Sequence, residues 1–318
     1  MVSKQAEKSI KQYRRFAKLL SILYRSPNEM TKWRIKLFRW FVDLQGTFGP
    51  KVKGTVKEEF NFNGVNTWKI STPNSNPDRV LLYFHGGAYS LGSPKSHYSL
   101  VSYLADITKT TVYVPDYRLG PESKYPAQLE DAITDYLLSE KKYNSNQIAF
   151  GGDSAGGNLA LVTLLKLIET KQDLPTSLAL LSPWTDLTGR GETYTAEMAN
   201  RDLLLGPIFK RVWENNDTLH GFYINEGEFD PENPYMVPLK GDFRKSPPIM
   251  IQVGSEELLL SDSESLKKIL DRDNCENEYF EWDGMYHVFH IDIRMPETIS
   301  AFEQIGNFLN KHLPSKKK

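Results

Sequence analysis

The chain has 318 residues, of which 40% are hydrophobic and 25% are charged, as in ordinary globular proteins. Its 39 Lys and Arg balance 40 Asp and Glu, which argues against a protein that mainly coats nucleic acid, because such proteins carry a basic excess. The single cysteine, Cys275, excludes an intrachain disulfide and a cysteine-rich zinc site.

Residues 1–45 are basic, with eleven Lys or Arg against three Asp or Glu. Apolar residues recur there at helical spacing, which predicts two amphipathic helices that separate near residues 26–28. The two apolar stripes are Ile10, Tyr13, Ala17, Leu20 and Tyr24, and then Trp33, Leu37, Trp40, Phe41 and Leu44. We expect both stripes to pack on the main body, since most amphipathic helices are half-buried. The less favoured alternative is a pair of helices that lie on a membrane surface.

No apolar segment is long enough for a membrane span or a secretory signal, so the default expectation is a cytoplasmic protein. From residue 55 onward, β-rich runs alternate with helical stretches. The runs are 55–62, 67–71, 80–84, 111–114, 147–150, 178–181, 249–253 and 278–282, and the helices are 96–108, 127–140, 156–170, 261–272 and 297–312. This alternation predicts an α/β fold with a mostly parallel central sheet and helices on both faces. Residues 186–240 lack a clear strand and are interpreted as an insertion over one edge of the sheet.

The strongest motif is a G-x-S-x-G pentapeptide between a predicted strand and a predicted helix. It consists of Gly152, Asp153, Ser154, Ala155 and Gly156. A sharp strand-to-helix turn of this kind lifts the serine hydroxyl above the sheet as a nucleophile. Its glycines remove side chains that would collide in so tight a turn. The N-terminus of the helix points backbone N–H groups at any negative charge that forms there.

A second motif follows the predicted strand 80–84 and reads His85, Gly86, Gly87, Ala88 and Tyr89. Small residues in such a loop can direct bare N–H groups toward a tetrahedral oxyanion, and the N–H of Ala155 would complete that hole. Neither a phosphate-binding Walker loop nor a dinucleotide loop occurs in the sequence. His85 is interpreted as a loop anchor rather than as a base.

A serine nucleophile needs a histidine base and an orienting carboxylate. His287 follows the last predicted strand and is the preferred base, with His290 as its rival. A metal site that uses both histidines is not expected, because no spaced carboxylate motif accompanies them. The carboxylate should follow the strand 249–253, where Glu256, Glu257 and Asp262 all qualify. The order serine, acid, histidine along the chain agrees with this kind of fold.

Taken together, these motifs resemble the bacterial hormone-sensitive-lipase family of α/β-hydrolase esterases. The oxyanion loop and the GDSAGG elbow of that family match residues 85–89 and 152–157. The stretch 116–131, with DYRLGPE, YPA and Asp131, resembles its DYRLAPE block, and residues 284–287 match its Gly-Met-x-His motif. The resemblance extends over roughly residues 75–312. Ala88 replaces a third glycine, and the usual Asp-Pro-Leu acid segment is absent, although alignment with that segment selects Glu257 over Glu256.

The resemblance implies an α/β-hydrolase fold with a helical cap. Residues 1–50 and 186–240 would form the cap, and residues 51–185 and 241–318 would form the core. It also implies cofactor-free hydrolysis of small esters with short acyl chains. Ser154, Glu257 and His287 would form the triad, and the oxyanion donors would come from Gly86, Gly87 or Ala88, and Ala155. An amidase, formamidase or peptidase would use the same triad, and a non-catalytic binding protein on this scaffold is the alternative from a different class.

Overall fold

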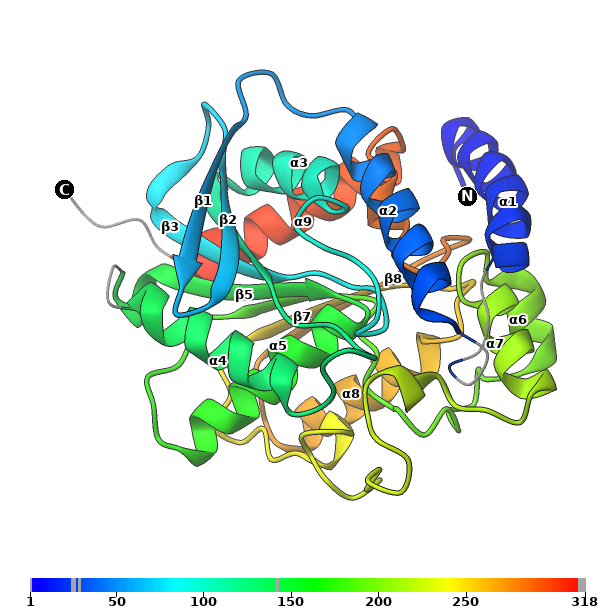
Figure 1. The fold of residues 1–318 in the computed structure, drawn as a ribbon. Coiled ribbons are helices and arrows are strands. Elements are labelled where there is room, and N and C mark those ends of the chain that lie inside the picture. Colours follow the sequence, from blue (N-terminus) through cyan, green and yellow to red (C-terminus); the bar gives the residue numbers. More distant parts are fainter. Residues whose placement is uncertain (1, 24–26, 28–29, 141–142, 314–318) are drawn as a thin grey trace.

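A computed structural model describes residues 2–23, 27, 30–140 and 143–313, without the side chains of residues 15–23 and 137–140. Its centre is an eight-stranded sheet in the order β1-β2-β4-β3-β5-β6-β7-β8 (Figure 1). The strands are β1 (Val56–Phe62), β2 (Val65–Ser71), β3 (Asn76–Phe84), β4 (Thr110–Asp116), β5 (Ile148–Asp153), β6 (Leu178–Leu181), β7 (Ile249–Gly254) and β8 (Asn277–Trp282). Strand β2 is antiparallel to β1 and to β4, and all other neighbours are parallel. The predicted α/β fold with a mostly parallel sheet is therefore confirmed.

Helices cover both faces of this sheet because its central strands are apolar on both sides. In β3, Leu81 and Tyr83 pack toward α3 (Tyr98–Thr108) and α9 (Pro296–His312). The alternate side chains of the same strand, Leu82 and Phe84, join the larger core beneath the other face. That face carries α4 (Ala127–Glu140), α5 (Ala155–Glu169) and α8 (Leu260–Arg272). Because the central strands are parallel, their carboxyl ends meet at one edge of the sheet. The loops with the predicted site residues lie at this edge.

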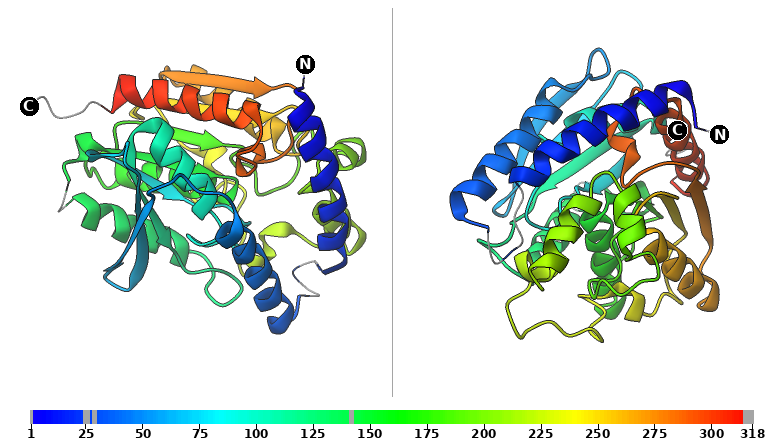
Figure 2. Two further views of the ribbon diagram at one scale, coloured as in Figure 1. Left: turned by 90° about the horizontal axis from the view of Figure 1, so that it is seen from above. Right: turned by 90° about the vertical axis from the view of Figure 1, so that its right-hand side faces the viewer.

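The N-terminal helices and the insertion lie over this edge. Helix α1 (Lys4–Leu23) runs along α7 (Gly206–Glu214) and reaches α9, whereas α2 (Lys32–Phe48) packs on α3 (Figures 1 and 2). The insertion also contains α6 (Ala196–Arg201) and the short 3-10 helices η3 (Leu219–Phe222) and η4 (Pro238–Lys240). Two further 3-10 turns are η2 (Ser145–Gln147) and η5 (Phe289–Ile291). Among the described helices, none combines the length and the hydrophobicity that a bilayer span requires.

The prediction for the second apolar stripe is wrong. The side chains of Trp33, Leu37 and Trp40 are 61%, 41% and 56% exposed, and the buried face of α2 instead carries Ile35 and Phe38. Both faces of this helix are apolar, so periodicity alone could not show which one packs on the body. In the first stripe, the side chains of Ala17 and Leu20 and the whole of Tyr24 lie outside the described part of the structure, as does most of the predicted break at 26–28.

Candidate active site

Ser154 lies at a sharp turn between β5 and α5. Its backbone has φ 53° and ψ −120°, a conformation that costs a non-glycine residue free energy and persists only where the surroundings enforce it. Gly156 allows this turn, because a Cβ atom there would lie 2.0 Å from the carbonyl oxygen of Phe84. The serine is 92% buried, at 8% exposure, and it lines a cavity at the end of the sheet.

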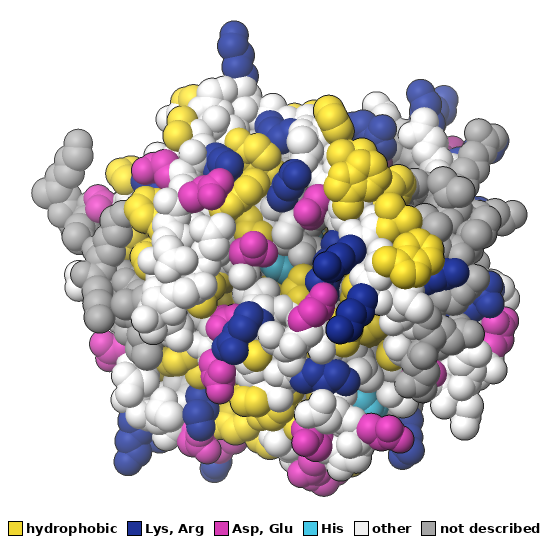
Figure 3. All heavy atoms as spheres, in the orientation of Figure 1, with side chains coloured by type: hydrophobic (Ala, Val, Ile, Leu, Met, Phe, Trp, Pro, Cys, Tyr) yellow, Lys and Arg dark blue, Asp and Glu magenta, His cyan; other side chains and the backbone are white. Residues whose placement is uncertain are grey.

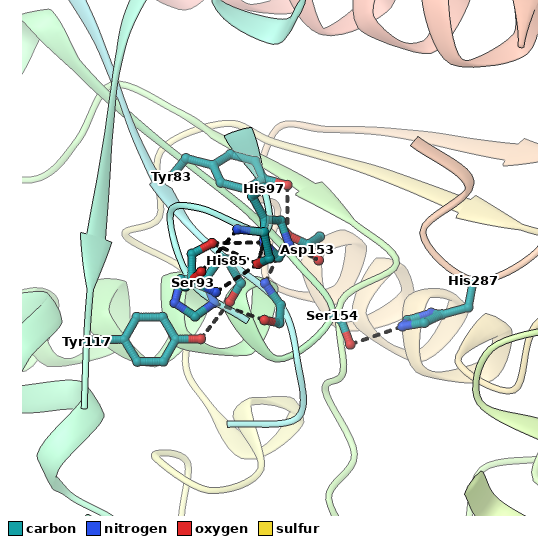
Figure 4. A network of polar contacts seen from close by, with 10 residues as sticks. Tyr83, His85, Ser93, His97, Tyr117, Asp153, Ser154 and His287 are labelled. Carbon is teal, nitrogen blue, oxygen red and sulfur yellow. Dashed lines mark hydrogen bonds and ion pairs between the residues drawn. The ribbon is translucent and has the colours of Figure 1, made fainter. Parts of the chain in front are cut away.

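The side chains of Ser154, His287 and Glu257 form a chain of hydrogen bonds. Ser154 Oγ lies 3.0 Å from Nε2 of His287, and Nδ1 of that imidazole lies 2.5 Å from Oε2 of Glu257. A carboxylate only accepts hydrogen bonds, so Nδ1 carries a proton and donates it. In the neutral imidazole, Nε2 is then free to accept the hydroxyl proton of the serine. Figure 4 shows the Ser154 side chain directed at His287.

Glu257 is fully buried, and its second oxygen is held by the protein. Oε1 accepts hydrogen bonds from the N–H of Gly254, at 2.6 Å, and from the hydroxyl of Ser182, at 2.8 Å. The Ser182 oxygen in turn accepts the N–H of Val288 at 3.2 Å, so one serine ties the acid to the histidine loop. Ser182 is not among the site residues predicted from the sequence. It follows β6 with a φ of +46°, and no sequence motif marks that position.

The environment of His287 favours its protonated form. Burial by itself lowers the pKa of this imidazole, but the charge of Glu257 and the hydrogen bond to it outweigh burial and raise the pKa above its ordinary value of 6.5. Asp202, a second buried carboxylate, adds to this effect. Its own oxygens accept the N–H groups of Leu258 and Leu205, so it also fixes the segment that carries Glu257.

The alternative base and the two alternative acids from the sequence have other hydrogen-bond or ion-pair partners. Nε2 of His290 lies 2.9 Å from Oε1 of Gln252, and burial lowers the pKa of this imidazole to about 3. Glu256 lies 3.7 Å from the guanidinium of Arg201. Asp262 is buried and accepts the N–H groups of Thr185 and Asp186, each at 2.8 Å. The structure therefore brings only Glu257, of the three acids considered, together with His287 and Ser154.

The glycine loop after β3 lines the same cavity, and its residues are not equivalent. Ala88 adopts φ 51°, and Gly87 adopts φ 122°. The N–H of Gly86 donates to Oδ1 of Asp153 at 3.0 Å, so that amide is already used within the protein. Ala155 is the first residue of α5, where N–H groups have no acceptor within the helix. Gly87, Ala88 and Ala155 are thus better suited than Gly86 to receive a ligand oxygen.

His85 lies behind this loop and not at the serine. Its Nδ1 donates to the carbonyl of Gly86 at 2.9 Å, and its ring stacks on Tyr117 with 4.2 Å between centroids. Burial lowers the pKa of His85 to about 3, which keeps the imidazole neutral. These contacts agree with the interpretation of His85 as a loop anchor.

His97 directly precedes α3, but its side chain is only 11% exposed and pairs with Asp153. Its Nε2 lies 3.3 Å from Oδ1 of that carboxylate (Figure 4). Its Nδ1 lies 2.8 Å from Ser96 Oγ and 3.3 Å from the carbonyl oxygen of Ser93, which can only accept a hydrogen bond. Both ring nitrogens therefore face acceptors, and the geometry selects the imidazolium form of His97.

The charges of this pair stabilise each other. Burial acts against ionisation of both groups, but the attraction between them raises the pKa of His97 above 6.5 and lowers that of Asp153 below 3.8. Asp43 adds to the shift of His97, and the Tyr83 hydroxyl donates to Asp153 at 2.8 Å. Because Asp153 also holds Gly86, the ion pair lies directly behind the glycine loop.

The pair predicts a pH-dependent contribution to stability. A raised histidine pKa stabilises the fold fully below 6.5 and loses its effect as the pH rises through the folded-state value. A lowered aspartate pKa stabilises the fold above 3.8. We expect His97→Gln to lower Tm more at about pH 6 than at about pH 9, relative to the parent chain. Thermal melts of both proteins at the two pH values test this, and an equal loss at both would contradict a charged His97.

The cavity at the serine has a volume of about 570 Å³. Its floor consists of Ser154, His287 and the glycine loop. Its apolar walls come from α2, from the insertion and from the core, and include Phe38, Val42, Trp184, Leu205, Phe209 and Leu219. A cavity that contains a serine hydrogen-bonded to a histidine and has mostly apolar walls suits a small, largely apolar ligand.

Comparisons with known proteins agree with this fold. Residues 81–291 match a family described as having the alpha/beta hydrolase fold, so the chain belongs to that family. An acetyl-hydrolase of Streptomyces hygroscopicus is 37% identical over 73% of this chain and 75% of its own length. An esterase of Acinetobacter venetianus is 31% identical over 72% of this chain and 74% of its own length.

Among solved structures, an esterase of the bacterial hormone-sensitive-lipase family superposes with a TM-score of 0.85. It is 30% identical in sequence, and the match covers 98% of this chain and 99% of that one. The protein is accordingly a bacterial hormone-sensitive-lipase-type α/β hydrolase, a carboxylesterase-like enzyme, as the motifs implied.

Proposed function

We propose that the protein hydrolyses carboxylic esters with short acyl groups through a triad of Ser154, His287 and Glu257. The observation that carries this proposal is the hydrogen-bonded chain, with 3.0 Å from Ser154 Oγ to His287 Nε2 and 2.5 Å from His287 Nδ1 to Glu257. In such a chain the imidazole takes the hydroxyl proton while the oxygen attacks the acyl carbon, and the carboxylate stabilises the resulting imidazolium.

The remaining steps follow from the same groups. The N–H groups of Gly87, Ala88 and Ala155 would hold the oxyanion of the tetrahedral intermediate. The intermediate collapses to an acyl-enzyme as His287 returns the proton to the leaving alcohol. Water, deprotonated by His287, then attacks the acyl carbon and releases the carboxylic acid and the free serine. No step in this sequence requires a cofactor.

We further propose that residues 1–50 and 186–240 act as a cap on a core formed by 51–185 and 241–318. Cavity walls from α2 and α7 support this division. The preference for short acyl groups is supported by the similarity to an acetyl-hydrolase. The cavity of about 570 Å³ exceeds the size of such a group, so it has room for an apolar alcohol part as well.

A series of p-nitrophenyl esters of increasing acyl length tests the substrate class. We expect kcat/KM to be highest for the shortest acyl groups and to fall as the chain lengthens. The matched p-nitroanilides should react far more slowly. Anilides that react as fast as the esters would favour the amidase alternative. A chain that binds such esters but turns none over would instead be a binding protein.

The acid is tested by three matched variants. Glu257→Gln should lower kcat by at least about 10²-fold, since loss of the orienting carboxylate costs about 10⁴-fold in a serine protease. It should also move the acidic limb of the rate profile to lower pH, because Glu257 raises the pKa of His287. Glu256→Gln should cost less than about tenfold, because its carboxylate faces Arg201.

Asp262→Asn completes the series as a buried carboxylate that does not reach the histidine. It accepts two backbone N–H groups, so thermal melts must accompany the kinetics in order to separate misfolding from lost catalysis. Should Glu257→Gln remain active while Glu256→Gln or Asp262→Asn is inactive but folded, the acid would have to be reassigned.

A further inference from the structure

The outer face of α2 carries an apolar stripe that is largely exposed in the described part of the chain, with only Leu44 half-buried. Trp33, Leu37, Trp40, Leu44 and Phe48 follow one another at steps of three or four residues, which places them on one side of a helix. Trp33 and Trp40 are more than half exposed, and Phe48 is 79% exposed. Figure 3 shows hydrophobic side chains gathered over this helix. A stripe of this length is not explained by packing within the described part of the chain.

The opposite face of α2 is fixed against the body, so the stripe cannot turn inward. Gly46 lies so close to the neighbouring segment that a Cβ atom there would be 2.1 Å from the carbonyl oxygen of Lys95. Arg39 also binds this helix to the core, with hydrogen bonds to the carbonyls of Ser90 and Gly120 and an ion pair with Glu122. The outward orientation of the tryptophans is therefore built into the packing of α2.

Cations accompany the stripe. Lys32 and Lys36 are exposed beside it, and the guanidinium of Arg34 lies 5.0 Å from the centroid of the Trp33 ring. The acid in this helix, Asp43, already accepts a hydrogen bond from the Ser93 hydroxyl at 2.5 Å. Exposed tryptophans flanked by Lys and Arg are the composition of helices that lie in a membrane–water interface with anionic lipids.

The stripe also ends at the cavity. Phe48 lines the cavity that contains Ser154, as do Gly49 and Pro50 directly after it, although Phe48 is mostly exposed. The last member of the stripe thus belongs to the mouth of the cavity. Any surface that bound the stripe would therefore also lie against the mouth of the cavity.

We propose that the outer face of α2 docks on the surface of an anionic lipid bilayer and there admits lipid-dispersed esters to the cavity. The tryptophan and leucine side chains enter the interface, and Lys32, Arg34 and Lys36 face the lipid phosphates. The delivery of esters rests on the proposed function, whereas docking itself does not. Docking on a bilayer implies a substrate class, namely short-acyl esters whose alcohol part is apolar enough to reside in a membrane.

Vesicle sedimentation of the full chain tests the docking. We expect binding to mixed phosphatidylcholine–phosphatidylglycerol vesicles, weaker binding to phosphatidylcholine alone, and a loss of binding as salt screens the lysines. Trp33→Ser/Trp40→Ser should weaken binding at least about tenfold, and Lys32→Gln/Lys36→Gln should reduce its dependence on anionic lipid, with Arg34 as the remaining cation. These four residues do not line the cavity, so turnover of a water-soluble ester should stay unchanged.

Two controls separate the possible explanations. Trp213→Ser removes a 39% exposed tryptophan of α7, outside the stripe, and should bind vesicles like the parent chain. Ser154→Ala should also bind normally, because docking needs no chemistry. A chain that binds vesicles but hydrolyses no ester would overturn the proposed function and leave the docking intact.

Three results would overturn the docking proposal. The first is an absence of sedimentation with either kind of vesicle. The second is unchanged binding by the double tryptophan variant. The third is light scattering that shows a dimer of the parent chain and a monomer of that variant, since the stripe would then be an interface between two copies.

Discussion

Replacing Ser154 by alanine is expected to lower kcat by about 10⁶-fold, the scale of loss on removing the nucleophile of a serine protease. The hydroxyl is the group that lies 3.0 Å from Nε2 of His287, and the strained backbone at φ 53° positions it at the floor of the cavity. Residual turnover should come only from the oxyanion donors and from substrate binding. The fold should be retained, because alanine removes a single oxygen atom.

Labelling with a fluorophosphonate provides the second measurement for this variant. The parent chain should react with one equivalent, and Ser154→Ala should not react at all. Ser145→Ala is a matched control, since Ser145 lies at the opposite end of β5 from Ser154, and it should label normally. A fluorophosphonate adduct that persists in Ser154→Ala would mean that another residue is the nucleophile.

The elements that surround Ser154 could be predicted because their signals are local. The elbow has an apolar strand before it, a helix after it and small residues between them, and all of these are visible within about twenty residues of sequence. The structure has β5 at Ile148–Asp153 and α5 at Ala155–Glu169, close to the predicted 147–150 and 156–170. Local signals did not identify Glu257 as the acid. That choice depended on alignment with an acid segment of the family, Asp-Pro-Leu, which this chain lacks.

The supporting contacts could not be predicted because they join distant parts of the chain. Ser182 reaches Glu257 across 75 residues, and His97 reaches Asp153 across 56. Nothing in the neighbourhood of either residue in the sequence indicates its partner. The predicted orientation of α2 was wrong for a related reason. Both faces of this helix are apolar, and the close approach of Gly46 to Lys95 determines which of them packs on the body. Such a decision depends on tertiary packing and not on periodicity.

His287→Ala is expected to be nearly as damaging as Ser154→Ala, because nucleophile and base act as one unit and their losses do not add. The double variant Ser154→Ala/His287→Ala should therefore be about as slow as either single variant, a loss again near 10⁶-fold. The measurement is kcat for all three proteins with a short-chain p-nitrophenyl ester. An additive loss in the double variant would show that the two side chains contribute separately.

His290 supplies the matched control, three residues away on the same loop. Its imidazole faces Gln252 at 2.9 Å and has a pKa lowered to about 3 by burial, so it cannot take a proton from Ser154. His290→Ala would leave the Gln252 amide without this partner and should lower Tm, with kcat reduced by less than about tenfold in the folded fraction. His290→Gln, which restores a polar partner, should recover part of the lost stability. If His290→Ala were folded yet inactive while His287→Ala kept its activity, the base would be His290.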